Sequence, residues 1–350
     1  MRRKSRKVKV GKLYIGGDAP ITIQSMANTD TTNIKETIKQ IHELEDAGCE
    51  IIRVTAPTIE AAKALGEIKK NISIPLVADI HFDYKIALEA AKYTDKLRIN
   101  PGNIGKEDKI KLVVNAAKEH SIPIRIGVNL GSLQLDIFEK YGYSAEGMVE
   151  SALRHVKILE DLDFYDTIVS LKASDVQRTV EAYRLFSKKN DYPLHLGVTE
   201  AGSKFPGTIK SSIAFGILLS EGIGDTIRVS LSADPAEEVK VGKKILKYLG
   251  LRKSGVEITS CPTCGRTNIN VIKIVEELEN KTEKISKPIH IAVMGCAVNG
   301  PGECKKADIG VVGGPGDANL LYKHGERVGK VEDSKIVETL LKEINMLDKQ

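Results

Sequence analysis

Residues 51–80 read IIRVTAPTIEAAKALGEIKKNISIPLVADI. A β-branched run from Ile51 to Thr55 is followed by an amphipathic stretch from Ile59 to Lys69 and by a second apolar run from Leu76 to Ile80. The hydrophobic pattern changes from that of a buried strand to that of a helix and back again. The segment therefore predicts a strand–helix–strand unit whose two strands lie parallel.

The same alternation runs from residue 20 to the end of the eighth unit, with a repeat of roughly 25 to 35 residues. Eight such units are typical of an α/β protein of the (β/α)8 TIM-type barrel class, whose buried parallel strands are nearly continuous apolar runs. A doubly wound open sheet is the alternative, but no glycine fingerprint follows the first strand. The predicted strands are Ile21 to Ser25, Ile51 to Thr55, Leu76 to Ile80, Lys96 to Asn100, Ile124 to Val128, Thr167 to Leu171, Leu194 to Val198 and Thr226 to Ser230. The predicted helices are Asn33 to Ala47, Ile59 to Lys69, Lys106 to His120, Ala145 to Leu159, Asp175 to Ser187, Gly207 to Leu219 and Pro235 to Leu249.

A chain of 350 residues exceeds what one hydrophobic core usually supports, so we expect two domains. Residues 1–250 would form the barrel, and residues 251–350 a smaller domain that combines strands and helices in an α+β pattern. Its predicted strands are Glu257 to Thr259, Ile289 to Met294, Asp308 to Val312 and Asn319 to Tyr322, and its helices lie near Asn270 to Glu279 and Ser334 to Ile344.

Composition and charge exclude several classes of protein. With 41% hydrophobic and 28% charged residues, the composition is that of an ordinary globular protein. No apolar stretch reaches the roughly 18 residues that span a bilayer, so no membrane association is expected. The basic run from Met1 to Val10 is not followed by the apolar region of a signal peptide, which predicts a solvated arm and a cytoplasmic protein. Because the chain has no tryptophan and few other aromatics, nucleic acid is not an expected partner.

Catalytic residues of such barrels lie at the carboxyl ends of the strands. Cations recur at these ends, where side by side they would repel one another and lose hydration unless a polyanion neutralised them. Because the arginine fork matches phosphate oxygens, we predict a diphosphate or bisphosphate substrate. The cations are Arg53, Arg98, Arg125, Lys172 and Arg228, and the same strand ends add Gln24, Asp79, His81, Asn100, Asn129, Thr199, Glu200, Ser230 and Ser232.

Two strand ends supply candidate acid–base groups. Glu200 is the preferred candidate, because burial would raise the pKa of its carboxyl even with cations nearby. Asp79 and His81 lie two residues apart at one strand end and would orient substrate hydroxyls or relay a proton. The remaining histidines are interpreted as structural, namely His42, His120, His155 and His195.

The last third of the chain carries four of its five cysteines, which predicts a metal or iron–sulfur site. Cys261 and Cys264 share one tight turn, and Cys296 opens a loop rich in glycine and proline, which brings backbone close to a cofactor. On spacing alone, structural zinc held by these three cysteines and Cys304 is as good an interpretation as an iron–sulfur cluster. Disulfides are disfavoured in a cytosolic chain, and Cys49, in an apolar stretch, is expected to be an inert core thiol.

Eight blocks of sequence, taken in order, closely resemble the 4-hydroxy-3-methylbut-2-enyl diphosphate synthase family over nearly the whole chain. Any one block is weak, but their order and the cysteine block after a complete barrel make the match specific. The blocks are Gln24-Ser25-Met26, Arg53-Val54, Ala78-Asp79-Ile80-His81-Phe82, Arg98-Ile99-Asn100-Pro101-Gly102-Asn103, Gly127-Val128-Asn129, Thr199-Glu200-Ala201-Gly202, Cys261-Pro262-Thr263-Cys264-Gly265-Arg266 and Cys296-Ala297-Val298-Asn299-Gly300-Pro301-Gly302-Glu303.

The resemblance implies an oxidoreductase of the methylerythritol phosphate route to isoprenoids. Such an enzyme opens the ring of 2-C-methyl-D-erythritol 2,4-cyclodiphosphate and reductively dehydrates it to 4-hydroxy-3-methylbut-2-enyl diphosphate, with two electrons from ferredoxin or flavodoxin. The resemblance also implies a 4Fe-4S cluster held by Cys261, Cys264, Cys296 and the carboxylate of Glu303, with the adjacent Cys304 as a bystander or substitute ligand. The alternative is a zinc-stabilised barrel enzyme that acts on a sugar phosphate without redox chemistry.

The segment between the two domains bears on the oligomeric state. The short link from Leu251 to Gly255 follows the eighth helix, whose C-terminus lies at the face of a barrel opposite the catalytic one. The cluster has to reach the catalytic face. We therefore expect a homodimer in which the cluster domain of one subunit caps the barrel of the other, as the resemblance also suggests.

Overall fold

The computed structural model describes residues 2–99, 104 and 107–349 of the chain. These residues form two compact units, the first ending at Leu251 and the second beginning at Arg252. Each unit has its own hydrophobic core. Among the described residues, no helix has the length and apolar character needed to cross a membrane.

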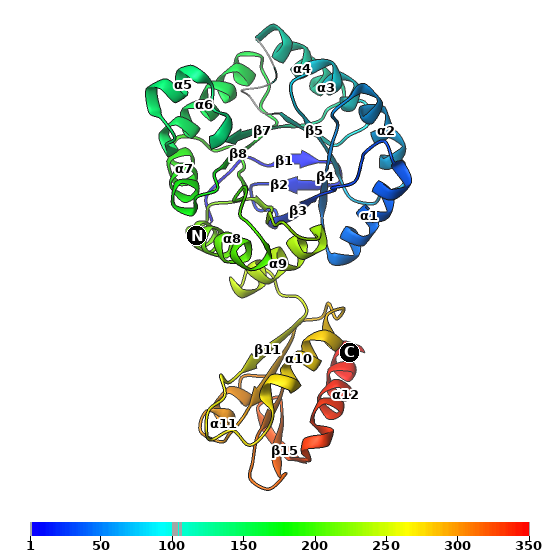
Figure 1. Ribbon diagram of the computed structural model, residues 1–350, viewed down its shortest axis with the longest axis vertical. Helices are drawn as coiled ribbons and strands as arrows, with labels where there is room; N and C mark the ends of the chain where they lie inside the picture. Colours follow the sequence, from blue (N-terminus) through cyan, green and yellow to red (C-terminus); the bar gives the residue numbers. More distant parts are fainter. Residues whose placement is uncertain (1, 100–103, 105–106, 350) are drawn as a thin grey trace. The chain divides into compact units, whose positions relative to one another are not determined.

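The first unit is a barrel of eight parallel strands surrounded by helices, which confirms the predicted fold (Figure 1). The strand order is β8-β7-β6-β5-β4-β3-β10-β9, and a parallel bridge between Val169 and Leu194 joins β8 to the residue before β9. The strands are β3 (Thr22–Met26), β4 (Ile51–Thr55), β5 (Leu76–Ile80), β6 (Lys96–Ile99), β7 (Ile124–Asn129), β8 (Thr167–Lys172), β9 (His195–Leu196) and β10 (Thr226–Ile227). The helices are α1 (Ile34–Ala47), α2 (Ile59–Lys70), α3 (Tyr84–Ala91), α4 (Glu107–Glu119), α5 (Leu135–Tyr141), α6 (Ala145–Asp161), α7 (Val176–Lys189), α8 (Lys204–Ser220) and α9 (Pro235–Tyr248), with a 3-10 turn, η1 (Leu130–Ser132), before α5.

Most predicted strands match within two residues, whereas β9 and β10 are shorter than expected. Gly197 follows β9, and a glycine weakens a strand because it has no side chain to pack. The helices α3 and α5 were not predicted. The short α3 nevertheless completes the alternation, because it connects β5 to the parallel strand β6.

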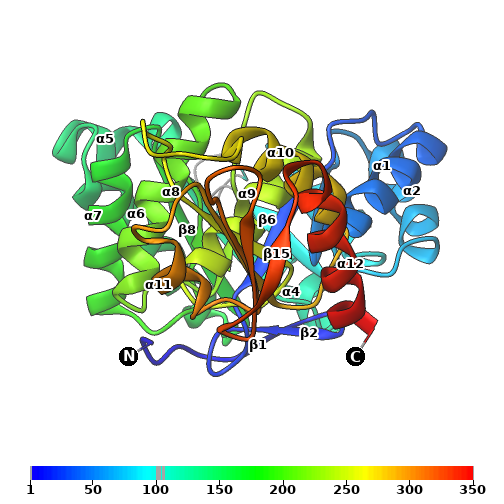
Figure 2. The same ribbon diagram turned by 90° about the horizontal axis from the view of Figure 1, so that it is seen from below.

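The N-terminal segment is not a solvated arm, and that prediction is wrong. Its strands β1 (Val8–Val10) and β2 (Leu13–Ile15) form an antiparallel hairpin. The hairpin crosses the ring of strands in Figure 1 and lies at one end of the barrel in Figure 2. Its apolar side chains pack on the bottom layer of the barrel interior, in a cluster of Val8, Val10, Ile15, Ile51, Val77 and Ile168. The run of basic residues had hidden this period-two alternation.

The basic residues before the hairpin fasten it to the bottom of the barrel. Arg2 Nη2 lies 2.8 Å from Oδ1 of the buried Asp225, and Ser5 Oγ donates to the same oxygen at 2.9 Å. Arg3 donates to the carbonyl oxygens of Asn190 and Tyr192 at 2.7 and 2.6 Å. These charges are therefore structural contacts of the barrel.

The second unit is a five-stranded sheet covered by helices on both faces, of the predicted α+β class. The order β11-β12-β13-β14-β15 begins with three parallel strands and ends with two antiparallel ones. Helices α10 and α12 pack on one face and α11 on the other. The elements are β11 (Val256–Ser260), α10 (Val271–Thr282), β12 (Ile289–Met294), α11 (Gly300–Cys304), β13 (Ile309–Val312), β14 (Asn319–Lys323), β15 (Glu326–Val331), a 3-10 turn η2 (Asp333–Lys335) and α12 (Ile336–Lys349). Neither α11 nor β15 was predicted.

Candidate active site

The predicted cations lie on neighbouring strands inside the barrel. The register places Arg98 on β6 opposite Asp79 on β5 and also opposite Arg125 on β7. Arg53, Arg98, Arg125 and Lys172 are all buried, with 7%, 5%, 1% and 5% of their surface exposed. Side chains of this length and charge are almost never buried unless something pairs with them. Because they are buried close together, these cations require a compensating negative charge nearby.

Asp79 compensates two of these arginines. Its Oδ1 lies 2.8 Å from Arg98 Nη1, and its Oδ2 lies 3.4 Å from Arg53 Nε. Burial alone would raise the pKa of the Asp79 carboxyl, but Arg53, the hydrogen bond from His81 and Arg98 outweigh it and hold the pKa well below its usual range. Burial also lowers the pKa of the Arg53 guanidinium to about 9, against the attraction of Asp79. Asp79 is therefore an ionised carboxylate that fixes two arginine forks.

Arg228 has a different partner, Glu238, which the sequence analysis missed. Arg228 Nη2 lies 3.3 Å from both carboxylate oxygens of Glu238, and that carboxylate also accepts from Ser25 Oγ and the Leu231 N–H. Glu238 is buried although it stands in the first turn of α9, where an acidic residue usually serves the helix dipole. Its position in a helix, away from the strand ends, is the reason that no sequence signal identified it.

Arg125 and Lys172 have no carboxylate partner among the described residues. Arg125 Nε and Nη1 are buried without any hydrogen-bond partner there. Burial, with a smaller effect of the neighbouring cations, lowers the pKa of both side chains well below its usual range. The barrel makes room for them: a Cβ atom on Gly197 would lie 2.7 Å from Lys172 Nζ, and one on Gly127 would lie 2.5 Å from Arg98 Nε. These uncompensated donors suit a multiply charged anion.

A lower layer of the barrel adds two groups that were not on the predicted list of site residues. Lys96 is fully buried at the start of β6, and the hydrogen bond it makes is a long one of 3.4 Å to Gln24 Oε1. His195 is also fully buried, and neither of its ring nitrogens has a partner within the described ranges. Burial first, and then Arg125, lower the pKa of His195 well below its usual range, so the imidazole is neutral. Buried nitrogen groups with few hydrogen-bond partners thus extend below the strand ends.

The proposed acid–base residues lie at the mouth of the barrel. His81 Nε2 is 3.2 Å from Arg98 Nη1 and 3.6 Å from Asp79 Oδ1, and 35% of its side chain is exposed. Glu200 accepts a hydrogen bond from Thr199 Oγ1 at 2.9 Å. Its side chain is exposed, so the expectation of a buried Glu200 is wrong: the loop after β9 carries the carboxylate out of the core.

Two residues at this mouth have a strained backbone. Glu200 has a φ of 46° and Phe82, which follows His81, has a φ of 62°, both in the left-handed region that favours glycine. Such conformations persist where the surrounding structure enforces them, often at functional sites. One of the two strained residues is the candidate Glu200 and the other directly follows the candidate His81, which supports a functional mouth.

The remaining polar candidates frame the same opening. Asn129 ends β7 opposite Lys172 of β8 and is half-buried. Ser230 is half-buried, whereas Ser232 is exposed and its backbone N–H donates to the Gly202 carbonyl oxygen at 2.9 Å. Asn100, the other predicted amide, lies outside the described residues.

In the second unit, the cysteines gather at one edge of the sheet. Cys261 directly follows β11 and Cys296 follows β12 by two residues, and these two strands are parallel neighbours. The backbone N–H of Gly295 donates to Cys261 Sγ at 3.2 Å. Thr263, within the Cys261–Cys264 turn, has a left-handed φ of 50°. The two cysteine loops are therefore tied together where parallel strands end.

Glycines allow these loops to pack closely. A Cβ atom on Gly295 would lie 2.8 Å from the Thr267 side chain and 3.2 Å from Cys261 Sγ. A Cβ atom on Gly313 would lie 2.4 Å from the Gly295 carbonyl oxygen. Only glycine is accommodated at such distances, so the backbone around the cysteines is shaped for close approach.

The structure separates the two adjacent candidates for the fourth ligand. Glu303 is half-buried on α11, and its Oε1 lies 3.3 Å from Lys306 Nζ. Cys304, the last residue of α11, is fully buried, and a Cβ atom on Gly310 would lie 2.4 Å from its Sγ. Burial raises the pKa of this thiol to about 12. Cys304 is therefore a core residue, which disfavours the zinc site that would need its thiolate.

The donor set fits an iron–sulfur group. All five cysteines are free thiols, and the three outside the cores lie on the two joined loops and their shared edge. A hydrogen bond from a backbone N–H to a cysteine sulfur, as at Cys261, is a usual feature of cluster sites. No three metal-ligating side chains lie together as a compact site for a single ion in the part of the chain that the structure describes.

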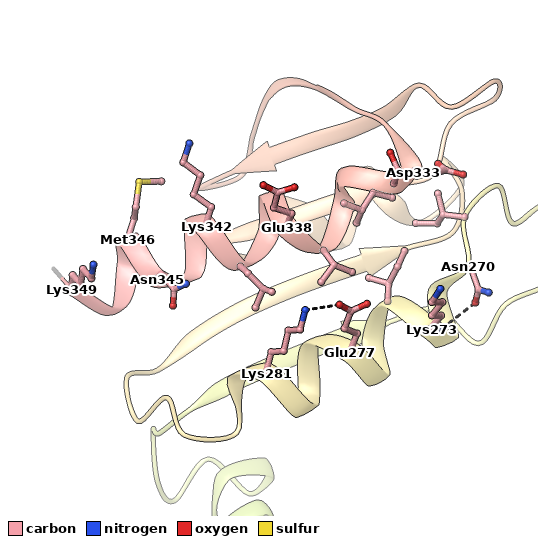
Figure 3. Close-up of a pocket in the computed structure, with 16 residues that line it drawn as sticks. Asn270, Lys273, Glu277, Lys281, Asp333, Glu338, Lys342, Asn345, Met346 and Lys349 are labelled. Carbon is pink, nitrogen blue, oxygen red and sulfur yellow. Dashed lines mark hydrogen bonds and ion pairs between the residues drawn. The ribbon is translucent and has the colours of Figure 1, made fainter.

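A groove in the second unit does not coincide with these candidates. It runs between α10 and α12 and is lined by residues such as Lys273, Glu277, Glu338 and Lys342 (Figure 3). The ion pair between Lys281 and Glu277, at 2.6 Å, lies along it. None of its lining residues is a predicted site residue, so the chemistry is to be sought at the barrel mouth and the cysteine loops.

Comparisons with known proteins cover both units. The family model described as the GcpE TIM-barrel domain matches residues 5–243, and the one described as the GcpE protein C-terminal domain matches residues 257–346. A protein of Clostridium acetobutylicum named 4-hydroxy-3-methylbut-2-en-1-yl diphosphate synthase (flavodoxin) is 59% identical over 98% of this chain and 99% of its own length. A protein of Geobacillus kaustophilus with the same name is 58% identical over 99% of this chain and 93% of its own length.

Solved structures with much lower identity share the barrel alone. The Yersinia pestis dihydropteroate synthase matches with a TM-score of 0.52 at 10% identity, over 70% of this chain and 98% of that one. A type I 3-dehydroquinate dehydratase from Clostridium difficile matches with a TM-score of 0.51 at 19% identity, over 70% of this chain and 98% of that one. These matches support the (β/α)8 fold.

Proposed function

The chain belongs to the GcpE family, and from that premise we propose that it acts as the 4-hydroxy-3-methylbut-2-en-1-yl diphosphate synthase for which its relatives are named, an isoprenoid biosynthetic oxidoreductase with flavodoxin as electron donor. The identity extends over both units and over nearly the full length of those relatives. The observation that carries the assignment within the molecule is the set of buried, incompletely compensated cations in the barrel.

The proposed substrate is 2-C-methyl-D-erythritol 2,4-cyclodiphosphate. Its two phosphates would supply the negative charge that Arg125 and Lys172 lack, while Asp79 and Glu238 hold the forks of Arg53, Arg98 and Arg228 in place beforehand. Because these donors are already oriented, the reorganisation free energy is small when charge develops in the reaction. Thr199, Asn100, Asn129, Ser230 and Ser232 are proposed as further donors to the substrate.

The reaction consumes two electrons and two protons, breaks one bond between carbon and ring diphosphate oxygen, and releases one hydroxyl oxygen as water. Glu200, at the mouth and held by Thr199, is the proposed proton donor or acceptor. His81 and Asp79 form a linked pair beside Arg98, which suits them to hold a substrate hydroxyl or pass on a proton. In this proposal, the barrel side chains bind the substrate, orient it and transfer protons to it.

The proposed cofactor is a 4Fe-4S cluster held by Cys261, Cys264, Cys296 and Glu303. When bound, it supplies one-electron transfer from the flavodoxin to the substrate. The burial of Cys304 supports Glu303 as the fourth ligand, and an oxygen ligand is more easily displaced from iron than a thiolate. The alternative, a zinc protein without redox chemistry, would contain zinc and lack the brown colour of thiolate-bound iron.

We also propose that the enzyme is a homodimer in which the cluster unit of one subunit caps the barrel of the other. Seven residues, 249–255, connect the end of α9 to β11. Fully extended, they reach at most about 25 Å. That length disfavours a cap by the same chain, since α9 ends at the bottom of the barrel. The cytoplasmic location stays a prediction.

Anaerobic turnover tests the proposal. Protein purified without oxygen and supplied with reduced flavodoxin should convert the cyclic diphosphate to 4-hydroxy-3-methylbut-2-enyl diphosphate with two electrons per product. Mixing Cys296→Ala with Glu200→Ala should restore part of the activity if the site is shared between subunits. Absence of turnover in iron-loaded protein would refute the function, and failed complementation in a demonstrated mixed dimer would refute the shared site.

A further inference from the structure

A layer of buried polar side chains that lack hydrogen-bond partners lies beneath the cations of the barrel mouth. His195 is fully buried, and neither of its ring nitrogens has a partner in the described part of the chain. Lys96 is fully buried as well, and the hydrogen bond it makes, to Gln24 Oε1, is 3.4 Å long. Gln24 Nε2 and Thr226 Oγ1 are also buried without a partner among those residues. Because buried polar groups in proteins are normally paired, this layer lowers the stability of the free barrel.

The layer lies between the cations of the mouth and an apolar plug. Thr226 of β10 pairs with His195 of β9, so both side chains lie on the same face of the sheet. Lys96 precedes Arg98 by two residues on β6, and side chains two apart in a strand also share a face. Below them, the hairpin of β1 and β2 packs on the apolar cluster at the bottom of the barrel. The layer is therefore closed from below and adjoins the cations above it.

The cations that face this layer keep its two titratable groups neutral. Burial first, and then Arg125 of β7 and Lys172 of β8, lower the pKa of His195 well below its usual range. Burial first, and then Arg125 and Arg53, lower the pKa of Lys96 well below its usual range. Both effects disfavour the charged form of a base. His195 and Lys96 are therefore neutral in the free barrel at neutral pH.

The carboxylates around the layer are paired with other cations. These pairs are Asp79 with Arg53 and Arg98, Glu238 with Arg228, Asp95 with Lys69, and Asp225 with Arg2 and Arg3. Asp95 raises the pKa of Lys96, but less than burial and the nearby arginines lower it. Tyr183 of α7 donates its hydroxyl to the carbonyl oxygen of His195 and not to the ring. Among the residues that the structure describes, none supplies the negative charge that would hold protons on this layer.

We propose that His195 and Lys96 form a proton-binding layer beneath the anion site: both are neutral in the free barrel, and both take up a proton when a diphosphate binds to Arg125 and Lys172 above them. A bound polyanion offsets the positive charge that keeps the two groups neutral, and a nearby opposite charge favours the protonated form. Each uptake adds one proton from water to a nitrogen lone pair and changes no other bond. The proposal rests on the anion site of the proposed function but not on its reaction.

Such a layer changes its charge with the occupancy of the site. In the free barrel, neutral His195 and Lys96 add nothing to the repulsion among the buried arginines, and in the complex they add two positive charges that attract the anion. A proton needs no cavity, so the layer gains this charge while it stays closed. By linkage, the binding of an anion that takes up protons weakens as the pH rises, by up to about tenfold in the dissociation constant per pH unit for each proton.

Nitrogen-15 NMR of the full chain with labelled histidine tests the proposal directly. At pH 7 the His195 ring should carry one N–H in the free chain and two after saturation with inorganic diphosphate. His195→Gln removes the ring and thereby assigns its signals. The internal control is His120, which follows α4 at an exposed position, so its ring signals should not change when diphosphate is added.

Calorimetry gives an independent count of the protons. With buffers of different ionisation enthalpy at pH 7, the wild-type chain should take up about one proton more per bound diphosphate than Lys96→Met does. The ionisation of the ligand itself is common to both chains and cancels in this difference. The matched control is Lys111→Met at an exposed position of α4, which should take up as many protons as the wild type.

The two measurements use different residues, so if one variant fails to fold, the other measurement decides. A His195 ring that keeps a single N–H at saturation, equal proton uptake by the wild type and Lys96→Met, or absence of diphosphate binding would overturn the proposal. Neither measurement follows turnover. A chain that protonates His195 but leaves the cyclic diphosphate unconverted would therefore refute the proposed function and leave the layer intact, whereas an active chain with a neutral His195 would refute the layer alone.

Discussion

Replacing Asp79 by asparagine should destabilise the barrel strongly, although the two side chains have nearly the same shape. Asp79 is 2% exposed and pairs with Arg98 at 2.8 Å and with Arg53 at 3.4 Å. Asparagine keeps the volume but leaves two buried guanidinium groups without a counter-charge. Removing one partner of a buried ion pair typically costs about 3–5 kcal/mol of unfolding free energy. For a unit of this size the midpoint of thermal unfolding should fall by about 6–20 °C.

Far-UV circular dichroism is the suitable probe, because the chain has no tryptophan for fluorescence. The control is Asp18→Asn, which removes the surface pair between Asp18 and Lys7, since 85% of the Asp18 side chain is exposed. That control should leave the midpoint unchanged, because exposed pairs contribute little. Inorganic diphosphate bound to the folded barrel should lower the unfolding midpoint of neither Asp79→Asn nor Asp18→Asn.

The pH dependence follows from the low pKa of Asp79. A carboxyl whose pKa is depressed by folding contributes stability above its unfolded pKa of about 3.9, and that contribution is lost as the pH falls through the folded pKa. The difference in unfolding free energy between the wild type and Asp79→Asn should therefore have its full size at neutral pH and decrease only below about pH 4. At neutral pH, an unfolding midpoint of Asp79→Asn within 2 °C of the control would contradict the reasoning, because that shift corresponds to a loss of stability of at most about 1 kcal/mol.

Three further substitutions test other parts of the structure. Lys172→Met removes an uncompensated buried cation, so the free protein should gain about 1–4 kcal/mol in urea unfolding while its affinity for inorganic diphosphate falls. Because folding lowers the pKa of Lys172, the gain should be largest at low pH and shrink as the pH approaches about 10.4; an unchanged or lower stability at neutral pH would contradict it. Gly310→Ala forces a Cβ atom to 2.4 Å from Cys304 Sγ, so the free energy of unfolding should fall by about 1–3 kcal/mol and the iron content should also fall. The control Gly302→Ala, whose Cβ atom would meet nothing within 4 Å, should keep the wild-type iron content. Equal iron contents in the two variants would contradict the packing argument. Arg3→Ala loses hydrogen bonds to two carbonyl oxygens at the bottom of the barrel, so the free energy of thermal unfolding should fall by about 1–3 kcal/mol. The control Lys4→Ala, at an exposed position, should leave the stability unchanged. An unchanged stability of Arg3→Ala would show that the N-terminal arm is dispensable.

The barrel could be predicted because parallel strands are buried on both faces. Strand β5 is buried at all five positions, and such strands stand out in the sequence as apolar runs between amphipathic helices. The cations were identifiable for the same reason: Arg98 and Lys172 are charged residues near the carboxyl ends of fully buried strands. Strand position therefore revealed both the fold and half of the candidate site.

The partners of those cations were harder to predict, because they depend on contacts between distant segments. Glu238 is 10 residues from Arg228 and lies on a helix, where its buried role resembles ordinary helix charge. Lys96 stands at the start of its strand, and its burial shows only when the barrel closes. In the hairpin, the alternation of Val8 and Val10 was masked by the surrounding lysines. The exposure of Glu200 depends on a left-handed turn that its sequence does not specify.

The most direct test of the central claim follows phosphorus during anaerobic turnover. Iron-loaded protein with reduced flavodoxin and the cyclic diphosphate should replace the phosphorus resonances of the ring by those of a linear diphosphate, and Lys172→Met should slow this conversion. If fully iron-loaded wild-type protein leaves the ring resonances unchanged while reduced flavodoxin remains in excess, the barrel cations do not serve this substrate and the account is contradicted.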